Sequence, residues 1–141
     1  VTCTVDEAPE IEVDEHAIAV LRYKNGLSRM ETRWGTFTDP WKYQPQPTCG
    51  FTFIGSDGTI LSPDYATHLS VQTRACPEIH QVAVDALTPG ERNGIEYMLS
   101  CLARGEPVGG PLDPALCLTA QRIVDTAAQS ALEKRTLKLL P

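Results

Sequence analysis

One short stretch of the chain carries side chains that could contact a small polar ligand. Trp41, Lys42 and Tyr43 are consecutive and fall in a long loop over residues 35–50. An aromatic ring suits the C–H side of a sugar ring, and a lysine ammonium can donate hydrogen bonds to hydroxyl groups. Loops longer than about 12 residues in compact domains are often functional. The alternative is that Trp41 and Tyr43 pack the loop onto a sheet or a partner subunit.

Motifs that usually carry catalysis or bind a cofactor are missing. The sequence has no GxGxxG or GxxxxGK[ST] loop and no Gly-x-Ser-x-Gly segment. We therefore expect no catalytic residue and no cofactor site within this chain. The histidines fall on expected strands, where a surface or hydrogen-bonded role is favoured over that of a base: His16, His68 and His80.

The cysteines, at positions 3, 49, 76, 101 and 117, form no closely spaced pair. A zinc site needs such pairs, so we expect no metal. The spacing also argues against a disulfide framework and favours reduced thiols in a cytoplasmic protein. Cys101 and Cys117 lie in expected helices, where a free cysteine behaves as a small hydrophobe.

The length and net charge of the chain limit its domain organisation and the kinds of molecule that it could bind. The chain has 141 residues, which fits one domain over residues 1–141. Its net charge of -6 argues against a nucleic-acid partner. No apolar run approaches the roughly 20 residues that cross a bilayer, so no membrane contact is expected. The start at Val1, without methionine, suggests a piece of a longer protein.

A hairpin is predicted around Asn25-Gly26, because these residues supply the positive φ angles of a type I′ turn. Residues 16–23 and 27–34 alternate as its strands. A two-residue turn places Lys24 opposite Leu27 and sets the register. The face that bears Leu21, Met30 and Trp34 is mostly apolar and is expected to meet the core.

The other face of this hairpin is half apolar and half charged. The expected register places Arg22 opposite Arg29, which is unfavourable unless an acid such as Glu31 lies nearby. An aliphatic centre rimmed by arginine and acid is typical of a subunit interface, and a solvated face is the alternative. We expect an isologous homodimer through this face. The interface candidates are Ile18, Val20, Arg22, Arg29, Glu31 and Arg33.

Further strands and two helices complete the expected fold. Strands are predicted over residues 1–5, 51–54, 59–62, 68–73, 79–86 and 136–140. The first helix is predicted to begin at a capping box of Thr88, Pro89 and Glu91, and the second at Asp113-Pro114. Strands first and helices last indicate an α+β fold. We expect a mostly antiparallel open-faced sheet of about six to eight strands, with two C-terminal helices packed on one face.

The chain also resembles the C-terminal domain of the Gfo/Idh/MocA (glucose-fructose oxidoreductase/inositol dehydrogenase) family. The resemblance runs from about Asp14 to Leu139, and GFTFIGSDGTI is similar to the family's Gly-Thr-x-Gly-Thr-Ile turn. The matching helix and strand positions are Asn93, Glu96, Tyr97, Gly105, Pro107, Gln121, Ile123, Val124, Asp125, Ser130, Ala131 and Thr136 to Leu139.

The resemblance implies a substrate and oligomerisation domain of an NAD(P)-dependent sugar or cyclitol dehydrogenase. Full-length members begin with a dinucleotide-binding domain and carry a catalytic lysine and histidine, and none of these parts is found here. NAD or NADP is therefore implied for the full-length enzyme only, and the isolated chain is expected to be inactive. Trp41, Lys42 and Tyr43 would form one wall of the substrate cleft.

Two other functions are compatible with the sequence. The chain could be a noncatalytic subunit that binds a partner protein through the same open sheet. It could also be a carbohydrate-binding module that uses Trp34, Trp41 and Tyr43. The module needs these rings coplanar and exposed, and the expected core-facing position of Trp34 argues against it.

Overall fold

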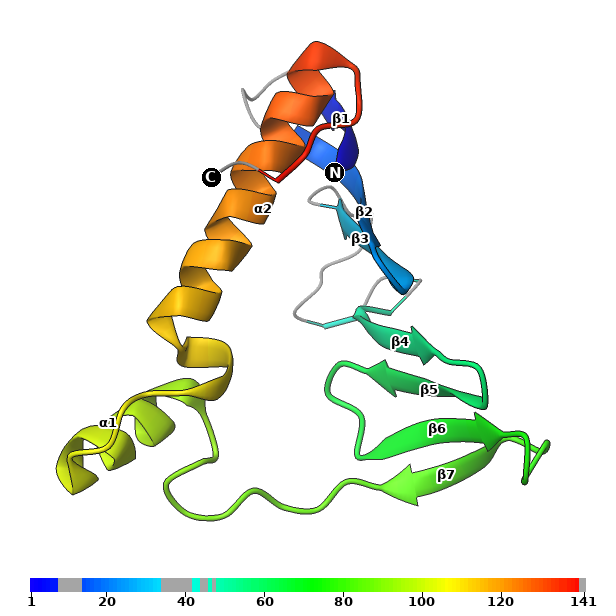
Figure 1. The fold of residues 1–141 in the computed structure, drawn as a ribbon. Helices are drawn as coiled ribbons and strands as arrows, with labels where there is room; N and C mark the ends of the chain where they lie inside the picture. Colours follow the sequence, from blue (N-terminus) through cyan, green and yellow to red (C-terminus); the bar gives the residue numbers. More distant parts are fainter. Residues whose placement is uncertain (8–13, 34–41, 44–45, 47, 140–141) are drawn as a thin grey trace. The chain divides into compact units, whose positions relative to one another are not determined.

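The computed structural model describes residues 1–7, 14–33, 42–43, 46 and 48–139, and only the backbone of residues 5–7 and 14. The chain forms two compact units (Figure 1). One comprises Val1–Gly35 and Pro89–Pro141, and the other comprises Thr36–Thr88. Each unit is described by itself.

The first unit contains a three-stranded antiparallel sheet, in the order β1-β2-β3, and both α-helices. Along β2, Ala19 and Leu21 are buried while Val20 and Arg22 are exposed, as expected for a strand with one covered face. The elements of this unit are β1 (Thr2–Glu7), β2 (Asp14–Tyr23), β3 (Gly26–Arg33), α1 (Gly94–Arg104), the short 3₁₀ helix η1 (Gly110–Leu112) and α2 (Pro114–Glu133).

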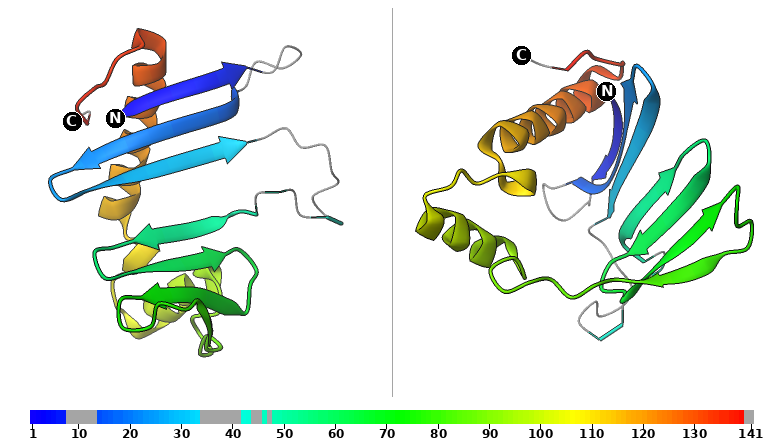
Figure 2. Two further views of the ribbon diagram at one scale, coloured as in Figure 1. Left: turned by 90° about the vertical axis from the view of Figure 1, so that its right-hand side faces the viewer. Right: turned by 60° about the horizontal axis from the view of Figure 1, so that its bottom comes forward.

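Helix α2 covers the buried face of this sheet and packs mainly against β1 (Figure 2). Small side chains meet at the contact, so the helix can approach the strands closely. The predicted packing of the α2 stripe on the face that bears Leu21 is confirmed, whereas Met30 is 42% exposed and Trp34 lies outside the described residues. The buried core is Cys3, Ala19, Leu21 and Ala127, with Val1, Ala17, Ile123 and Ala131 partly buried around it.

A buried serine ties α2 to the first strand. The backbone N–H of Cys3 donates to Ser130 Oγ at 3.1 Å, and Ser130 Oγ donates to the Arg135 carbonyl at 2.8 Å. Ser130 is only 1% exposed, and its hydrogen bond with Cys3 is buried. A buried hydroxyl with partners on two segments fixes the position of the helix more strictly than apolar contact alone.

The register of the hairpin differs from the prediction by two residues. Tyr23 pairs with Gly26, so Lys24-Asn25 forms the turn, and none of these residues has the positive φ of a type I′ turn. Because side chains alternate with a period of two, this shift leaves every side chain on its predicted face. Burial of Leu21 is the same in both registers and does not distinguish between them.

Helix α1 begins five residues later than a cap at Thr88 implies. Its N-cap is Asn93, whose side chain accepts from the Glu96 backbone N–H at 2.9 Å. The Glu96 carboxylate in turn accepts from the Arg92 backbone N–H at 3.0 Å, one residue before the N-cap, which gives a variant of the capping box. Gly90 has φ 93°, a conformation that a helix cannot include. The reciprocal hydrogen bonds around Asn93 therefore set the helix start.

Protonation of Glu96 should fray the start of α1. The hydrogen bonds from the Arg92 side chain and backbone hold the pKa of Glu96 below its ordinary value of 4.5. A lowered pKa means that the stabilisation is complete above the ordinary value and is lost as pH falls through the folded-state value. Backbone amide shifts of Glu96 and Tyr97, followed by NMR during acidification, should report this loss.

Glu96→Gln should remove the acid transition of these amides, while Glu78→Gln, in the other unit, should leave it unchanged. A Glu96 pKa at or above its ordinary value would contradict the capping-box contribution.

Helix α1 has apolar residues at helical spacing, but most of this stripe is exposed. Ile95, Leu99 and Leu102 are 70%, 57% and 62% exposed, and Cys101 is the buried residue of this helix. Of the two helices, α2 is therefore the one whose apolar stripe contributes to the core against β1. The period of the stripe indicates which face of a helix is apolar, but not what covers that face.

The segment after α2 is extended but is not a strand. Lys134 ends the helix in the left-handed conformation. Leu137 then exchanges two backbone hydrogen bonds with Val1, at 2.9 Å and 2.6 Å. One such pair is too little for a ladder, so the predicted strand over residues 136–140 is wrong for the part described, up to Leu139.

The second unit is a four-stranded antiparallel meander in the order β4-β5-β6-β7. The predicted hairpin across Gly55–Gly58 is confirmed, because Ile54 pairs with Thr59. The rings of Phe51 and Phe53 stack with their centroids 6.2 Å apart, and both rings are largely exposed. The strands are β4 (Gly50–Ile54), β5 (Gly58–Pro63), β6 (His68–Thr73) and β7 (His80–Ala83).

The predicted α+β class is confirmed. The described residues contain seven strands, within the expected range, but they form two hydrogen-bonded sheets instead of the single sheet that was expected. Alternation identifies each strand and its neighbour across a short turn. It carries no information about pairing across a long connection such as the one between β3 and β4.

Candidate functional site

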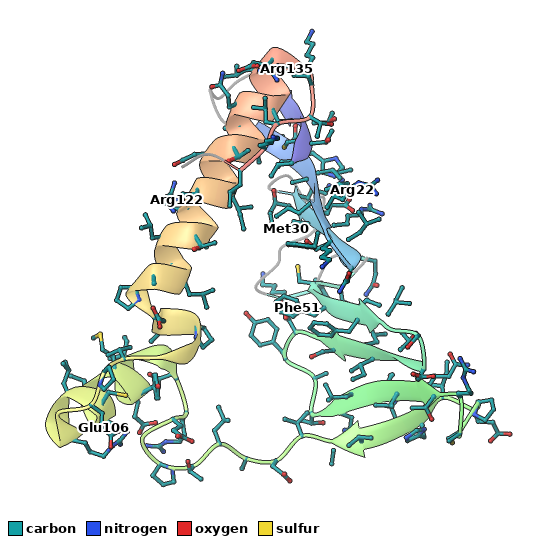
Figure 3. The ribbon with its side chains drawn as sticks, viewed as in Figure 1. Arg22, Met30, Phe51, Glu106, Arg122 and Arg135 are labelled. Atoms are coloured by element: carbon teal, nitrogen blue, oxygen red, sulfur yellow. The ribbon has the colours of Figure 1, made fainter. Side chains whose placement is uncertain are left out.

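The exposed side of the three-stranded sheet is the most distinctive surface among the described residues. We call it the open face and define it by His16, Ile18, Val20, Arg22, Leu27, Arg29, Glu31 and Arg33. These residues alternate with the buried Ala19 and Leu21, so they lie on the side opposite the core. Figure 3 shows Arg22 on the side of the sheet that is turned away from α2.

The observed register arranges the open face in rows. Arg22 lies opposite Leu27, Val20 opposite Arg29, and Ile18 opposite Glu31. The predicted pairing of Arg22 with Arg29 is therefore wrong, as are the pairings of Val20 with Glu31 and Ile18 with Arg33. Arg22 instead faces Leu27 and Arg29 faces Val20 across the ladder, while Arg33 lies opposite His16. The like-charge repulsion that the predicted register implied is absent from this pair of strands.

One carboxylate joins His16 and Arg29 on this face. Glu31 accepts from His16 Nε2 at 3.0 Å and forms an ion pair with Arg29. Hydrogen bonds from His16 and from Arg29 hold the pKa of Glu31 below its ordinary value. The prediction that Glu31 can compensate the arginines is confirmed for Arg29. The cluster links β2 and β3 on the solvent side of the sheet.

An aliphatic strip runs through the middle of the open face. Val20 is 39% exposed and Ile18 is half-buried. The ladder with β1 places Thr2 opposite Val20 and Thr4 opposite Ile18, so the strip continues into small polar side chains. A flat surface with an apolar centre and charges around it has the composition of protein–protein contacts, not of a small-molecule pocket.

All six predicted interface residues therefore lie together on one face, and sequence reasoning missed two others. His16 and Leu27 occupy positions of the same parity on the same strands. The alternation of side chains along a strand would have identified both, because His16 lies two residues before Ile18 and Leu27 lies two residues before Arg29. The omission matters for His16, because it is one of the hydrogen-bond partners of Glu31.

The substrate-side residues are only partly described. Lys42 and Tyr43 belong to the second unit and are exposed, with Tyr43 at 70%. Trp41 lies outside the described residues. The assignment of these side chains to a ligand stays a prediction.

The most evident recess in the second unit lies beside the β4–β5 turn and has a volume of about 390 Å³. Its polar side chains already bond to one another. Arg74 Nε lies 3.3 Å from Asp57 Oδ1, and Gln72 Nε2 donates to the Pro77 carbonyl at 2.8 Å. The Arg74–Asp57 contact fastens the loop after β6 to the β4–β5 turn, and the Gln72 hydrogen bond ties that loop to β6, so the recess is a consequence of the fold.

Other potential chemical groups are dispersed. The described residues contain no cluster of three His, Cys, Asp or Glu side chains that could hold a metal ion. No disulfide joins the five cysteines, all of which are among the described residues; Cys101 is buried as expected, whereas Cys117 is exposed. His68 and His80 begin strands β6 and β7, as predicted, and contact their local loops. Among the described helices, none has the length and apolarity to span a membrane.

Comparison with known proteins finds similarity among solved structures. No family profile and no curated protein sequence matches the chain. The crystal structure of a "putative oxidoreductase from Klebsiella pneumoniae" aligns over 99% of this chain with a TM-score of 0.66 and 15% sequence identity. The chain therefore shares the fold of the part of that protein with which it aligns. It covers 43% of that protein, so it spans less than half of its length.

Proposed function

We propose that the chain is the C-terminal substrate-binding and dimerisation domain of an NAD(P)-dependent sugar or cyclitol dehydrogenase. The observation that carries the proposal is the alignment of 99% of the chain with only 43% of an oxidoreductase. The similarity of residues 88–139 to the Gfo/Idh/MocA family supports the choice of reaction class. The reaction would transfer a hydride between a nicotinamide and a hydroxyl-bearing carbon of the substrate.

The proposal divides the work between this chain and a preceding domain. Binding the pyrophosphate of NAD(P) requires a glycine-rich turn at a helix N-terminus, and the chain has no such motif. Its own contribution would be contacts to the substrate from Trp41, Lys42 and Tyr43. Exposed aromatic and ammonium groups in this part of the second unit fit contacts to a polyhydroxylated ring.

The open face would supply the second activity, assembly into a dimer. Its aliphatic centre of Ile18 and Val20 and its rim of arginines and Glu31 support this role. Two such faces in contact would be isologous, as in most homodimers.

The isolated chain should bind neither NAD nor NADP. With no site for the pyrophosphate, calorimetry with either cofactor at about millimolar concentration should give no binding heat. The longer product of the same gene should bind one of the two cofactors and reduce it in the presence of a sugar or cyclitol. The matched control is the longer product without residues 1–141, which should keep cofactor binding and lose turnover.

Two results would overturn this proposal. One is a micromolar binding curve for the isolated chain. The other is a gene product without a dinucleotide-binding domain, which would favour the noncatalytic partner-binding subunit instead.

A further inference from the structure

The open face can be treated as a grid, because the ladders align its residues across three strands. One row contains Thr2, Val20 and Arg29, and the next contains Thr4, Ile18 and Glu31. Successive rows are two residues apart, or about 6.8 Å along the strands. The two aliphatic side chains therefore lie side by side in the β2 column, with one charge of each sign beside them in the β3 column.

This arrangement restricts how a second copy can be placed on the face. A two-fold axis of a face-to-face dimer lies in the plane of contact. If the strands of the two sheets pack in line with each other, the axis runs either along the strands or across them. An axis along β2 would place every β2 residue over its own counterpart. Arg22 would then meet Arg22 of the partner subunit, while Arg29 would meet only Thr2 of the partner subunit.

An axis across the strands, between the Val20 and Ile18 rows, gives a different result. Val20 then lies over Ile18 of the partner subunit, which joins the two aliphatic strips. Arg29 lies over Glu31 of the partner subunit, and the reciprocal contact forms by symmetry. Arg22 then lies over His16 of the partner subunit instead of over its own counterpart. This placement unites the apolar centres and opposes unlike charges.

We propose that two copies of the chain pack through their open faces with their β2 strands antiparallel, so that Arg29 of each copy pairs with Glu31 of the other. This inference rests on the proposed dimerisation and specifies its geometry. Glu31 already pairs with Arg29 of its own chain. The four groups would close a ring of alternating charge around the two-fold axis. A carboxylate has acceptor sites for both arginines and for His16.

Charge reversal with mixing tests this geometry. Arg29→Glu alone would oppose two carboxylates twice across the interface, and Glu31→Arg alone would oppose two arginines twice. Each variant should raise the dimer dissociation constant at least about 100-fold, because like charges in contact cost several kcal/mol. An equimolar mixture should form a heterodimer within about tenfold of the unmodified affinity, because both charge pairs are then restored.

Matched controls come from the C-terminal end of α1, where Arg104 and Glu106, two residues beyond it, form an exposed ion pair with the same spacing in sequence. Arg104→Glu and Glu106→Arg should leave dimerisation unchanged, alone and mixed. If either single variant on the open face does not fold, as judged by circular dichroism, the chain with both Arg29→Glu and Glu31→Arg replaces it. That double variant should dimerise like the unmodified chain.

The possible outcomes distinguish a failure of dimerisation itself from a failure of the antiparallel geometry. Sedimentation of the unmodified chain at about tens of micromolar first measures dimerisation itself. A monomeric profile would overturn the proposed assembly role together with the geometry. A dimer that tolerates both reversals, or that is weakened by each without recovery on mixing, would overturn the antiparallel geometry alone. Heterodimer formation by two variants that do not dimerise alone would support it.

Discussion

Replacing Leu21 with alanine should lower the free energy of unfolding by about 2–5 kcal/mol. Leu21 is 5% exposed and belongs to the core between the sheet and α2, where a truncated side chain leaves a cavity. Domains of this size are stable by about 5–15 kcal/mol, so the loss would be a large share of the total. Urea titration followed by the helical circular dichroism signal measures the loss.

Two further variants calibrate the Leu21 result. Leu27→Ala, on the same hairpin but 62% exposed, should change the free energy of unfolding by less than about 0.5 kcal/mol. Ile123→Ala should fall between the two, because Ile123 is only partly buried against the core. A Leu21→Ala loss no larger than that of Leu27→Ala would mean that α2 does not cover this face.

Replacing both Ile18 and Val20 with aspartate should abolish dimerisation. The change would bury unpaired carboxylates at the centre of the proposed interface, where each costs several kcal/mol. The expected rise in the dissociation constant is about 1,000-fold or more, which leaves a monomer at micromolar concentration. Both side chains lie on the face opposite the core, so the fold should survive.

Val84→Asp is the matched control for this prediction. Val84 is 52% exposed and belongs to the second unit, whereas the open face belongs to the first. It should leave the sedimentation profile unchanged. If the Ile18 and Val20 double variant dimerises as the unmodified chain does, the contact surface lies elsewhere.

The helix-to-sheet contact was the part of the fold most open to sequence reasoning. The spacing of Ile123, Ala127 and Ala131 identifies one face of a helix, and the alternation of Ala19 and Leu21 identifies one face of a strand. Both patterns arise from burial, and burial is what joins these two faces in the structure. The start of α2 at Asp113-Pro114 was predictable for a similar reason, because the cap depends only on neighbouring residues.

Other features depend on which of several competing interactions forms, and the sequence pattern does not show this. Thr88 and Asn93 both satisfy the rules for an N-cap, and the hydrogen bonds around Asn93 and Glu96 decide between them. Ile95 and Leu102 have the spacing of a buried stripe yet remain exposed. Periodicity records that a face is apolar, whereas its cover depends on chain segments far away in sequence.

The candidate site was predicted as a set of residues but not as an arrangement. Parity along the strands correctly grouped Ile18, Val20 and Arg22 with Arg29 and Glu31. The positions opposite one another were wrong, since they depend on which residues occupy the turn. The hydrogen bond between His16 and Glu31 follows from the observed alignment and could not be read from composition.

The residues buried in the core are the same in both hairpin registers, whereas the pattern of charges on the open face differs between them. A slip of two residues between β2 and β3 would keep Ala19 and Leu21 against α2, yet it would move Arg29 from Val20 to Arg22 and Glu31 from Ile18 to Val20. Substitutions at the Lys24-Asn25 turn can therefore redraw the charge pattern that a partner meets without changing what the core contains. Related chains that differ at this turn could therefore bind different partners while keeping the same buried residues. Mismatched charges alone would then prevent two such relatives from assembling with each other.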